Sequence, residues 1–172
     1  EFELVLYAEN EAAAEGAFFA ALARIQQLDE ILSDYSLSSE LSKLSAAAPT
    51  KEPVPLSADL FAVLQSAQQL AVDSDGAFDV TVGPLTKLWR RARRQKELPE
   101  AEQRKGAFAA VGHRFLKIDS AKKTAVLERP EMRLDVGGIA KGFAADEALK
   151  VITARGITSA LVRASGDIAT AE

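Results

Sequence analysis

The chain has 172 residues, of which 48% are hydrophobic and 27% are charged, a composition typical of an ordinary globular protein. It contains no cysteine, one histidine, and 21 basic against 25 acidic side chains, for a formal net charge of -4. These counts exclude disulfide scaffolds, thiol nucleophiles, iron–sulfur clusters and cysteine-ligated zinc. They also argue against a globally basic nucleic-acid binder. Any metal would have to meet oxygen ligands, which favours Mg²⁺ or Ca²⁺.

The first half of the chain alternates apolar and polar residues in a way that predicts one strand and three helices. Residues 2–6 read as a short strand. A short helix is expected to end at Leu44, and a second amphipathic helix to run from the cap candidate Ser57 to near Gly76. Before them, a long first helix is predicted by apolar residues at spacings of three and four: Phe18, Leu22, Ile25, Leu28 and Leu32.

The second half mixes strands and helices. The expected elements are, in chain order, a strand at 77–82, a basic helix after Pro84, a helix opened by Pro99, a hairpin of 115–118 with 124–127, a strand at 132–136, a helix at 139–154 and a strand at 159–163. Because helices alternate with strands and no repeat appears, we expect an α+β fold, a single mixed domain of strands with packed amphipathic helices over residues 1–172. Residues 165–170 resemble a strand leading into something further, so this domain is expected to be incomplete at its C-terminus.

Residues 133–142 carry the strongest chemical signal in the chain. Asp135 ends an expected strand, Gly137 and Gly138 form a turn, and Lys141 lies one turn into an expected helix. Glycine lets the backbone approach a phosphate closely, and a helix N-terminus offers unpaired N–H groups. Neither the P-loop nor the dinucleotide fingerprint is present, so a strand-to-helix turn with an incidental lysine remains the alternative.

Two further segments could contact a ligand. Asp79 and Thr81 interrupt an otherwise apolar run between Gly76 and Gly83, so their side chains could contact a ligand. An edge strand with both side chains facing water would give the same sequence pattern. Tyr35, in a serine-rich turn, could stack on a planar ring or could simply pack at a helix end.

Together these segments resemble the FAD:protein FMN transferases, formerly called thiamine biosynthesis lipoproteins. Residues 33–41 resemble the first family motif, and 76–89 resemble Gly-Ala-Phe-Asp-x-Thr-x-Gly-Pro-Leu-x-x-x-Trp. Residues 134–146 resemble Asp-x-Gly-Gly-Ile-Ala-Lys-Gly-x-x-x-Asp, and 165–168 are similar to a motif that usually reads Gly-Gly-Asp. Family members continue beyond this chain on both sides, with an upstream Met-Gly-Thr motif and with downstream Asp and Thr ligands to magnesium.

The resemblance implies that FAD is the substrate and that FMN passes to a Thr or Ser hydroxyl of a target protein, with release of AMP. It implies a Mg²⁺ site that includes the backbone carbonyl of Gly138, and it does not identify a catalytic base. The implied FAD contacts are Tyr35, Ala77, Phe78, Asp79, Asp135 and Lys141.

Two alternatives remain open, namely an FAD pyrophosphatase that yields FMN and AMP, and a non-catalytic FAD-binding module. The resemblance also implies a periplasmic position at the bacterial inner membrane, through a lipid anchor upstream of the chain. His113 lies outside every matched motif and is expected at the surface or in a hairpin. The basic run Arg90–Lys96 is expected to be a solvated helix face and not a nucleic-acid site. Such a face could meet an acidic partner or a membrane surface.

Overall fold

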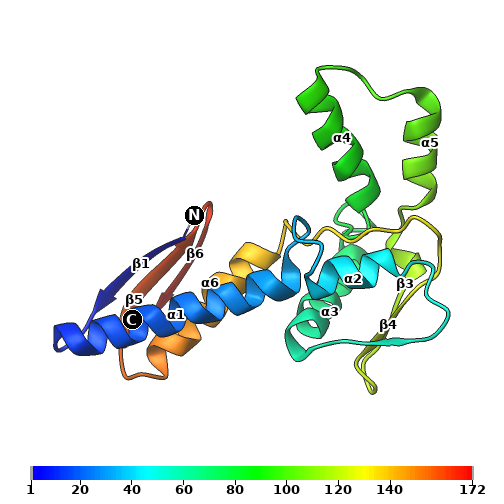
Figure 1. Ribbon diagram of the computed structural model, residues 1–172. Coiled ribbons are helices and arrows are strands. Elements are labelled where there is room, and N and C mark those ends of the chain that lie inside the picture. Colours follow the sequence, from blue (N-terminus) through cyan, green and yellow to red (C-terminus); the bar gives the residue numbers. More distant parts are fainter. Residues whose placement is uncertain (1, 172) are drawn as a thin grey trace. The chain divides into compact units, whose positions relative to one another are not determined.

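The computed structural model describes residues 2–171. Its elements are β1 (Phe2–Tyr7), α1 (Glu11–Leu32), α2 (Glu40–Ala46), β2 (Val54–Pro55), α3 (Ala58–Asp73), α4 (Gly83–Gln95), α5 (Ala101–Ala109), the 3-10 turn η1 (His113–Phe115), β3 (Leu116–Asp119), β4 (Thr124–Leu127), α6 (Ala140–Thr153), β5 (Ser159–Ala164) and β6 (Asp167–Ala171). The fold is the expected α+β class (Figure 1). The described residues divide into two compact units, one of residues 2–30 with 139–171 and one of residues 31–138.

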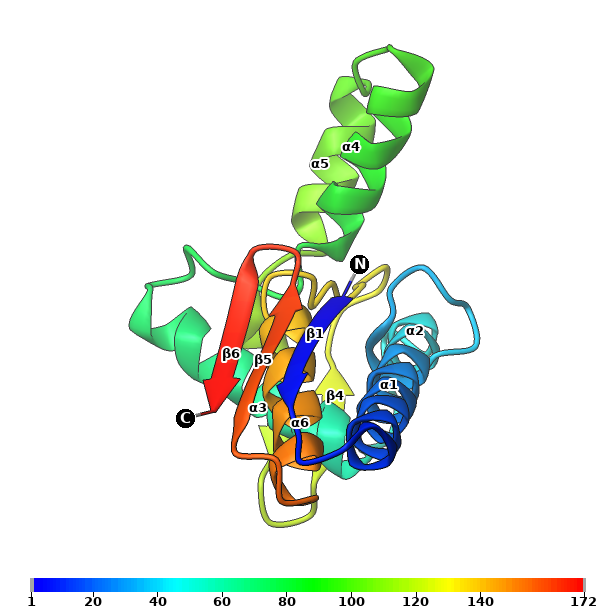
Figure 2. The same ribbon diagram turned by 90° about the vertical axis from the view of Figure 1, so that its left-hand side faces the viewer.

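The first unit is built from both ends of the chain. Its antiparallel sheet has the strand order β1-β5-β6, with Phe2 opposite Ala164 and Tyr7 opposite Ser159, and helix α6 covers one face of this sheet (Figure 2). Small side chains make up much of the interior, so the backbones can approach closely. Its buried residues are Ala17, Ala21, Ala145, Ala148, Ile152, Ile157, Ala160, Val162, Ala164 and Ala169.

The second unit, residues 31–138, contains the antiparallel sheet β2-β4-β3 and helices α2 to α5. Ser57 caps α3 as the sequence predicts, since its hydroxyl accepts from the Leu60 N–H at 3.2 Å. Helices α4 and α5 lie side by side and lead away from the rest of this unit (Figures 1 and 2). Across residues 2–171, no helix combines the length and apolar character that crossing a bilayer requires.

The strands predicted at 77–82 and 132–136 are wrong, because neither segment forms one. The two segments meet in a single parallel bridge between Val82 and Arg133. The Asp79 carboxylate accepts hydrogen bonds from the backbone N–H and the hydroxyl two residues later. Such local side-chain bonds favour a turn over an extended ladder.

Candidate functional site

The two glycine-rich segments lie against each other within the unit of residues 31–138. The N–H of Asp135 donates to the carbonyl of Val80 at 2.8 Å. A Cβ placed on Gly138 would lie 3.0 Å from the ring of Phe78, so only glycine lets the chain pass this close to the ring without displacing it. One site could therefore be built from both segments.

Gly83, at the start of α4, lies close to the backbone of Arg133. A Cβ at this position would lie 2.3 Å from the carbonyl oxygen of Arg133, which is well inside van der Waals contact. The absence of a side chain at Gly83 therefore sets how α4 begins beside residues 133–138.

Arg90 connects the predicted flavin contacts Tyr35 and Asp135. Its Nη2 donates to Asp135 Oδ2 at 3.0 Å, its Nη1 forms an ion pair with Asp34, and its guanidinium lies 4.6 Å from the centroid of the Tyr35 ring. The hydrogen bond to Asp34 raises the pKa of Arg90 above its ordinary value and outweighs desolvation, which acts in the opposite direction. We call Asp34, Tyr35, Arg90 and Asp135 the Arg90 cluster.

Burial differs sharply within the Arg90 cluster. The side chains of Asp34 and Asp135 are 11% and 8% exposed, whereas that of Arg90 is 37% exposed. Tyr35 is 77% exposed. Because the guanidinium covers one face of the Tyr35 ring, a planar ligand ring could stack on the other face.

Asp135 is held in a fixed orientation by bonds to both of its oxygens. Its Oδ2 accepts from Arg90, and its Oδ1 accepts from the N–H of Gly137 at 2.9 Å. A carboxylate offers about four lone-pair sites, so each oxygen can still accept a bond from a ligand.

Both carboxylate oxygens of Asp79 accept hydrogen bonds from nearby loop residues. Its Oδ1 accepts from the N–H and hydroxyl of Thr81 at 2.8 and 2.7 Å, and its Oδ2 accepts from the N–H of His113 at 2.8 Å. The half-buried His113 is therefore attached to this loop through its backbone. The N–H of Phe78 is likewise bonded, to the hydroxyl of Ser74 at 3.0 Å. The contacts of Ala77, Phe78 and Asp79 with FAD stay predictions.

Lys141 lies outside this unit. It occupies the first turn of α6 in the unit of residues 2–30 with 139–171, and its side chain is exposed. Its role at the diphosphate of FAD stays a prediction.

Residues 2–171 offer few ligands for a metal ion. Among residues 2–171 no group of three His, Cys, Asp or Glu side chains could hold one. Gly138 is exposed and offers a backbone carbonyl, but one carbonyl does not make a Mg²⁺ site, since that ion takes octahedral oxygen coordination. The described residues alone therefore do not fit a complete magnesium centre.

Sequence reasoning missed two members of the Arg90 cluster. The sequence places Asp34 only within the motif-like segment 33–41, and it places Arg90 only among several cations on an expected solvated helix. The one hint in the sequence is the spacing of Arg90 from Gly83, which places Arg90 two turns into the helix that begins beside the second glycine-rich segment. Its partners lie 56 and 45 residues away in the chain, beyond the reach of any local pattern.

The chain is similar in sequence to known proteins. The chain is 29% identical to an FAD:protein FMN transferase of Klebsiella pneumoniae over 167 residues, which cover 97% of this chain and 51% of that protein. It is 34% identical over 166 residues to one of Treponema pallidum, covering 94% of this chain and 44% of that protein.

Solved structures are similar as well. The flavin transferase ApbE from Vibrio cholerae matches with a TM-score of 0.88 and 26% identity, over 99% of this chain and 55% of that one. The Pseudomonas stutzeri flavinyl transferase ApbE, in its apo form, matches with a TM-score of 0.86 and 29% identity, over 98% of this chain and 54% of that one. The chain thus spans about half the length of the relatives it matches. Because the sequence profile of the ApbE family matches residues 1–172 throughout, the chain belongs to the ApbE family.

Proposed function

We propose that the full-length protein is an FAD:protein FMN transferase. A Thr or Ser hydroxyl of a target protein attacks the FMN phosphorus of FAD, the bond from that phosphorus to the bridging oxygen breaks, and AMP leaves with that oxygen. The hydroxyl proton passes to a general base, and FMN stays on the target as a phosphoester. The names of the relatives support this reaction, and the Arg90 cluster beside the Phe78–Gly138 contact is the observation that carries it.

The chain's own residues would bind and orient the flavin nucleotide. Tyr35 would stack on a ring through the face that Arg90 leaves open, and Asp135, already oriented by two bonds, would accept hydrogen bonds from ring or ribose donors. Lys141 would offset the charge of the diphosphate. These contacts bind and position FAD, so the proposal assigns them no proton transfer.

Dependence on Mg²⁺ is part of the proposal. The carbonyl of Gly138 would be one ligand, and the others would come from protein outside these 172 residues. Removal of divalent ions by EDTA should therefore abolish transfer, and added Mg²⁺ should restore it. Full transfer in EDTA would remove magnesium from the proposal.

We also propose that the two units belong to one flavin transferase domain, which continues beyond this chain, and that the protein works on the periplasmic side of the inner membrane. The resemblance of residues 33–41, 76–89 and 134–146 to the family motifs supports both statements. Cell fractionation of the natural host with a tagged full-length protein tests the location, and recovery in the cytoplasmic fraction would contradict it.

The decisive experiment incubates full-length protein with FAD, Mg²⁺ and a threonine-containing acceptor domain, and then measures acceptor mass and AMP. A mass gain of one FMN residue with equimolar AMP is expected. AMP and free FMN without labelled acceptor would indicate a pyrophosphatase instead, and FAD binding without AMP would indicate a binding module.

The two tyrosines of the chain provide a matched pair of variants. Tyr35→Ala removes the stacking ring and should raise the Kd for FAD about tenfold, as loss of one aromatic stacking contact of ~1 to 1.5 kcal/mol implies. Tyr7→Ala removes a ring that is similarly exposed, at 73%, on strand β1, and it should leave the Kd unchanged. Equal Kd values for both variants would contradict the placement of FAD at Tyr35.

A further inference from the structure

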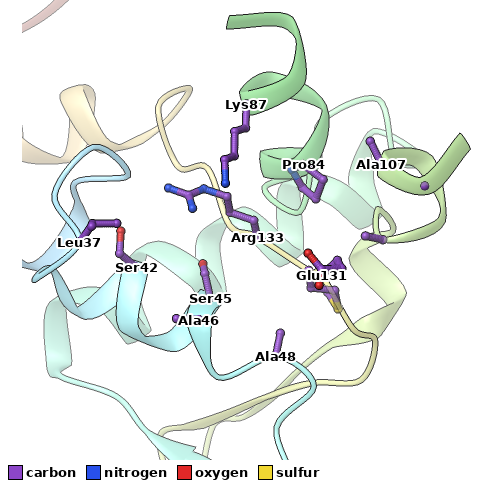
Figure 3. A pocket seen from close by; sticks show the side chains of 13 residues that line it. Leu37, Ser42, Ser45, Ala46, Ala48, Pro84, Lys87, Ala107, Glu131 and Arg133 are labelled. Carbon is purple, nitrogen blue, oxygen red and sulfur yellow. The ribbon is translucent and has the colours of Figure 1, made fainter. Parts of the chain in front are cut away.

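A cavity of about 520 Å³ opens in the unit of residues 31–138, beside the Arg90 cluster. Its walls come from α2, α4, α5 and the segment 131–133 (Figure 3). Pockets of this volume hold small ligands or short segments of a partner. None of the predicted flavin contacts lines this cavity, so the flavin hypothesis leaves it unassigned.

Two cationic side chains project into the same part of the cavity. Figure 3 shows the ammonium of Lys87 and the guanidinium of Arg133 pointing into one space. In the part of the chain that the structure describes, neither forms an ion pair with a carboxylate. Arg133 donates one hydrogen bond, from Nη2 to the backbone carbonyl of Asp34 at 2.9 Å, and an arginine has five N–H donors.

A buried hydroxyl adds a third donor to the cavity wall. Ser45 is 8% exposed, and its Oγ accepts from the N–H of Leu134 at 3.0 Å. Within residues 2–171 no acceptor takes the proton of that hydroxyl. The cavity also has one lining carboxylate, Glu131, which Figure 3 places on the far side of the Arg133 stem from Lys87.

Converging positive charges repel each other, and an anion placed between them removes that repulsion. Ammonium and guanidinium groups also form short, charge-assisted hydrogen bonds to carboxylate and phosphate oxygens. We propose that this cavity is an oxyanion-binding subsite in which Lys87 and Arg133 hold a carboxylate or phosphate group, with the Ser45 hydroxyl as a further donor. The subsite is separate from the flavin contacts and does not depend on flavin transfer.

The test measures anion binding by the full-length protein without FAD, by calorimetry or by NMR shifts of the cavity residues, at constant ionic strength in chloride. The probes are inorganic phosphate, N-acetyl-aspartate amide and, as the uncharged match, N-acetyl-asparagine amide. Saturable binding of phosphate or the aspartate probe is expected, with no binding of the asparagine probe. Binding of phosphate alone would identify the source as a free phosphate or phosphomonoester, and binding of the aspartate probe would identify it as a protein side chain.

Lys87→Met and Arg94→Met form a matched pair, because each removes one positive charge from α4. Lys87 is exposed, so its replacement should leave the fold intact. Lys87→Met should weaken binding about tenfold, as loss of one charge-assisted bond implies. Arg94 lies about 10 Å farther along the helix axis and does not line the cavity, so Arg94→Met should change binding less than twofold.

Three results would overturn the proposal. The first is the absence of saturable binding by both charged probes. The second is equal weakening by Lys87→Met and Arg94→Met, which would show only a diffuse effect of net charge. The third is a parallel loss of FAD affinity in Lys87→Met, which would make the cavity part of the flavin site. Failure of flavin transfer in the wild-type protein would leave the anion measurements unaffected, so the two proposals fail separately.

Discussion

Replacement of Arg90 by methionine tests whether the Arg90 cluster holds this unit together. The substitution keeps much of the apolar stem but removes the cation that pairs with Asp34 and Asp135. Breaking a fully buried pair costs about 3 to 5 kcal/mol, because the remaining charge is uncompensated, whereas an exposed pair contributes about 0 to 1 kcal/mol. The two carboxylates are nearly buried, but 37% of the Arg90 side chain is exposed to water. We therefore expect a loss of about 2 kcal/mol in the free energy of unfolding.

The assay is urea unfolding of the full-length protein without FAD, followed by circular dichroism and analysed for the transition of this unit. Arg91→Met is the control, since the Arg91 side chain is exposed and its Nε bonds only to Gln95, at 3.0 Å. That control should change the free energy by less than about 0.5 kcal/mol. Arg90→Lys keeps the charge but lacks the planar guanidinium whose two terminal nitrogens reach Asp34 and Asp135 separately. It should recover about half of the loss.

A double-mutant cycle separates the pair from the rest of the cluster. Arg90→Met and Asp135→Asn, alone and together, should give a coupling energy of about 1 kcal/mol, as expected for contacting charged groups. Arg90→Met within 0.5 kcal/mol of the wild type, or a coupling energy near zero, would refute the reasoning. The Arg90 contacts would then be surface contacts without energetic weight.

Two further predictions concern a close backbone approach and an ion pair. Gly83→Ala should destabilise the unit of residues 31–138 by about 3 kcal/mol or more, because the added Cβ would meet the Arg133 carbonyl at 2.3 Å. The control Gly106→Ala has no atom within 4 Å of its added Cβ and should stabilise α5 by about 0.5 to 1 kcal/mol. Thermal melts compare the two variants, and equal shifts in melting temperature would show that the Gly83 contact is relaxed in solution. Burial acts to raise the pKa of Glu147, but hydrogen bonds from Lys150 and from an arginine of α1 outweigh it and hold that pKa below 4.5. Glu147→Gln should therefore cost about 1 kcal/mol near pH 7, and the difference should vanish as the pH falls below 4.5 through the lowered value; a pH-independent difference in unfolding titrations would contradict it.

The helices were predictable because their signals are local. Ser57 caps α3 with its own hydroxyl, and the apolar spacing after it marks the buried face. The stripe expected on α1 was partly wrong, since Leu22 is exposed while Ala17 and Ala21 are fully buried. These alanines pack in one cluster with Ala148 of α6. A hydrophobicity pattern favours large apolar side chains as buried positions, so it does not identify a helix face that is buried through small residues.

The site was predictable only as a set of segments. The pattern of glycines indicated which stretches would bend, and the bends at Phe78 and Gly138 do lie together. The pairing of Arg90 with Asp34 and Asp135 depends on how α4 is oriented about its axis, and α4 begins where Gly83 passes close to the Arg133 backbone. Such a constraint acts between distant parts of the chain, so local sequence does not contain it.

The pairing of β1 with β5 has a consequence for biosynthesis. The two strands are separated by roughly 150 residues, and all of residues 31–138 are made between them. During translation β1 cannot pair with β5 until the ribosome has released β5, whereas the intervening unit can collapse as soon as it has emerged. Closing so large a loop carries an entropic cost that grows only slowly with its length. Early compaction of residues 31–138 would shorten the effective gap between the waiting strand and its partner.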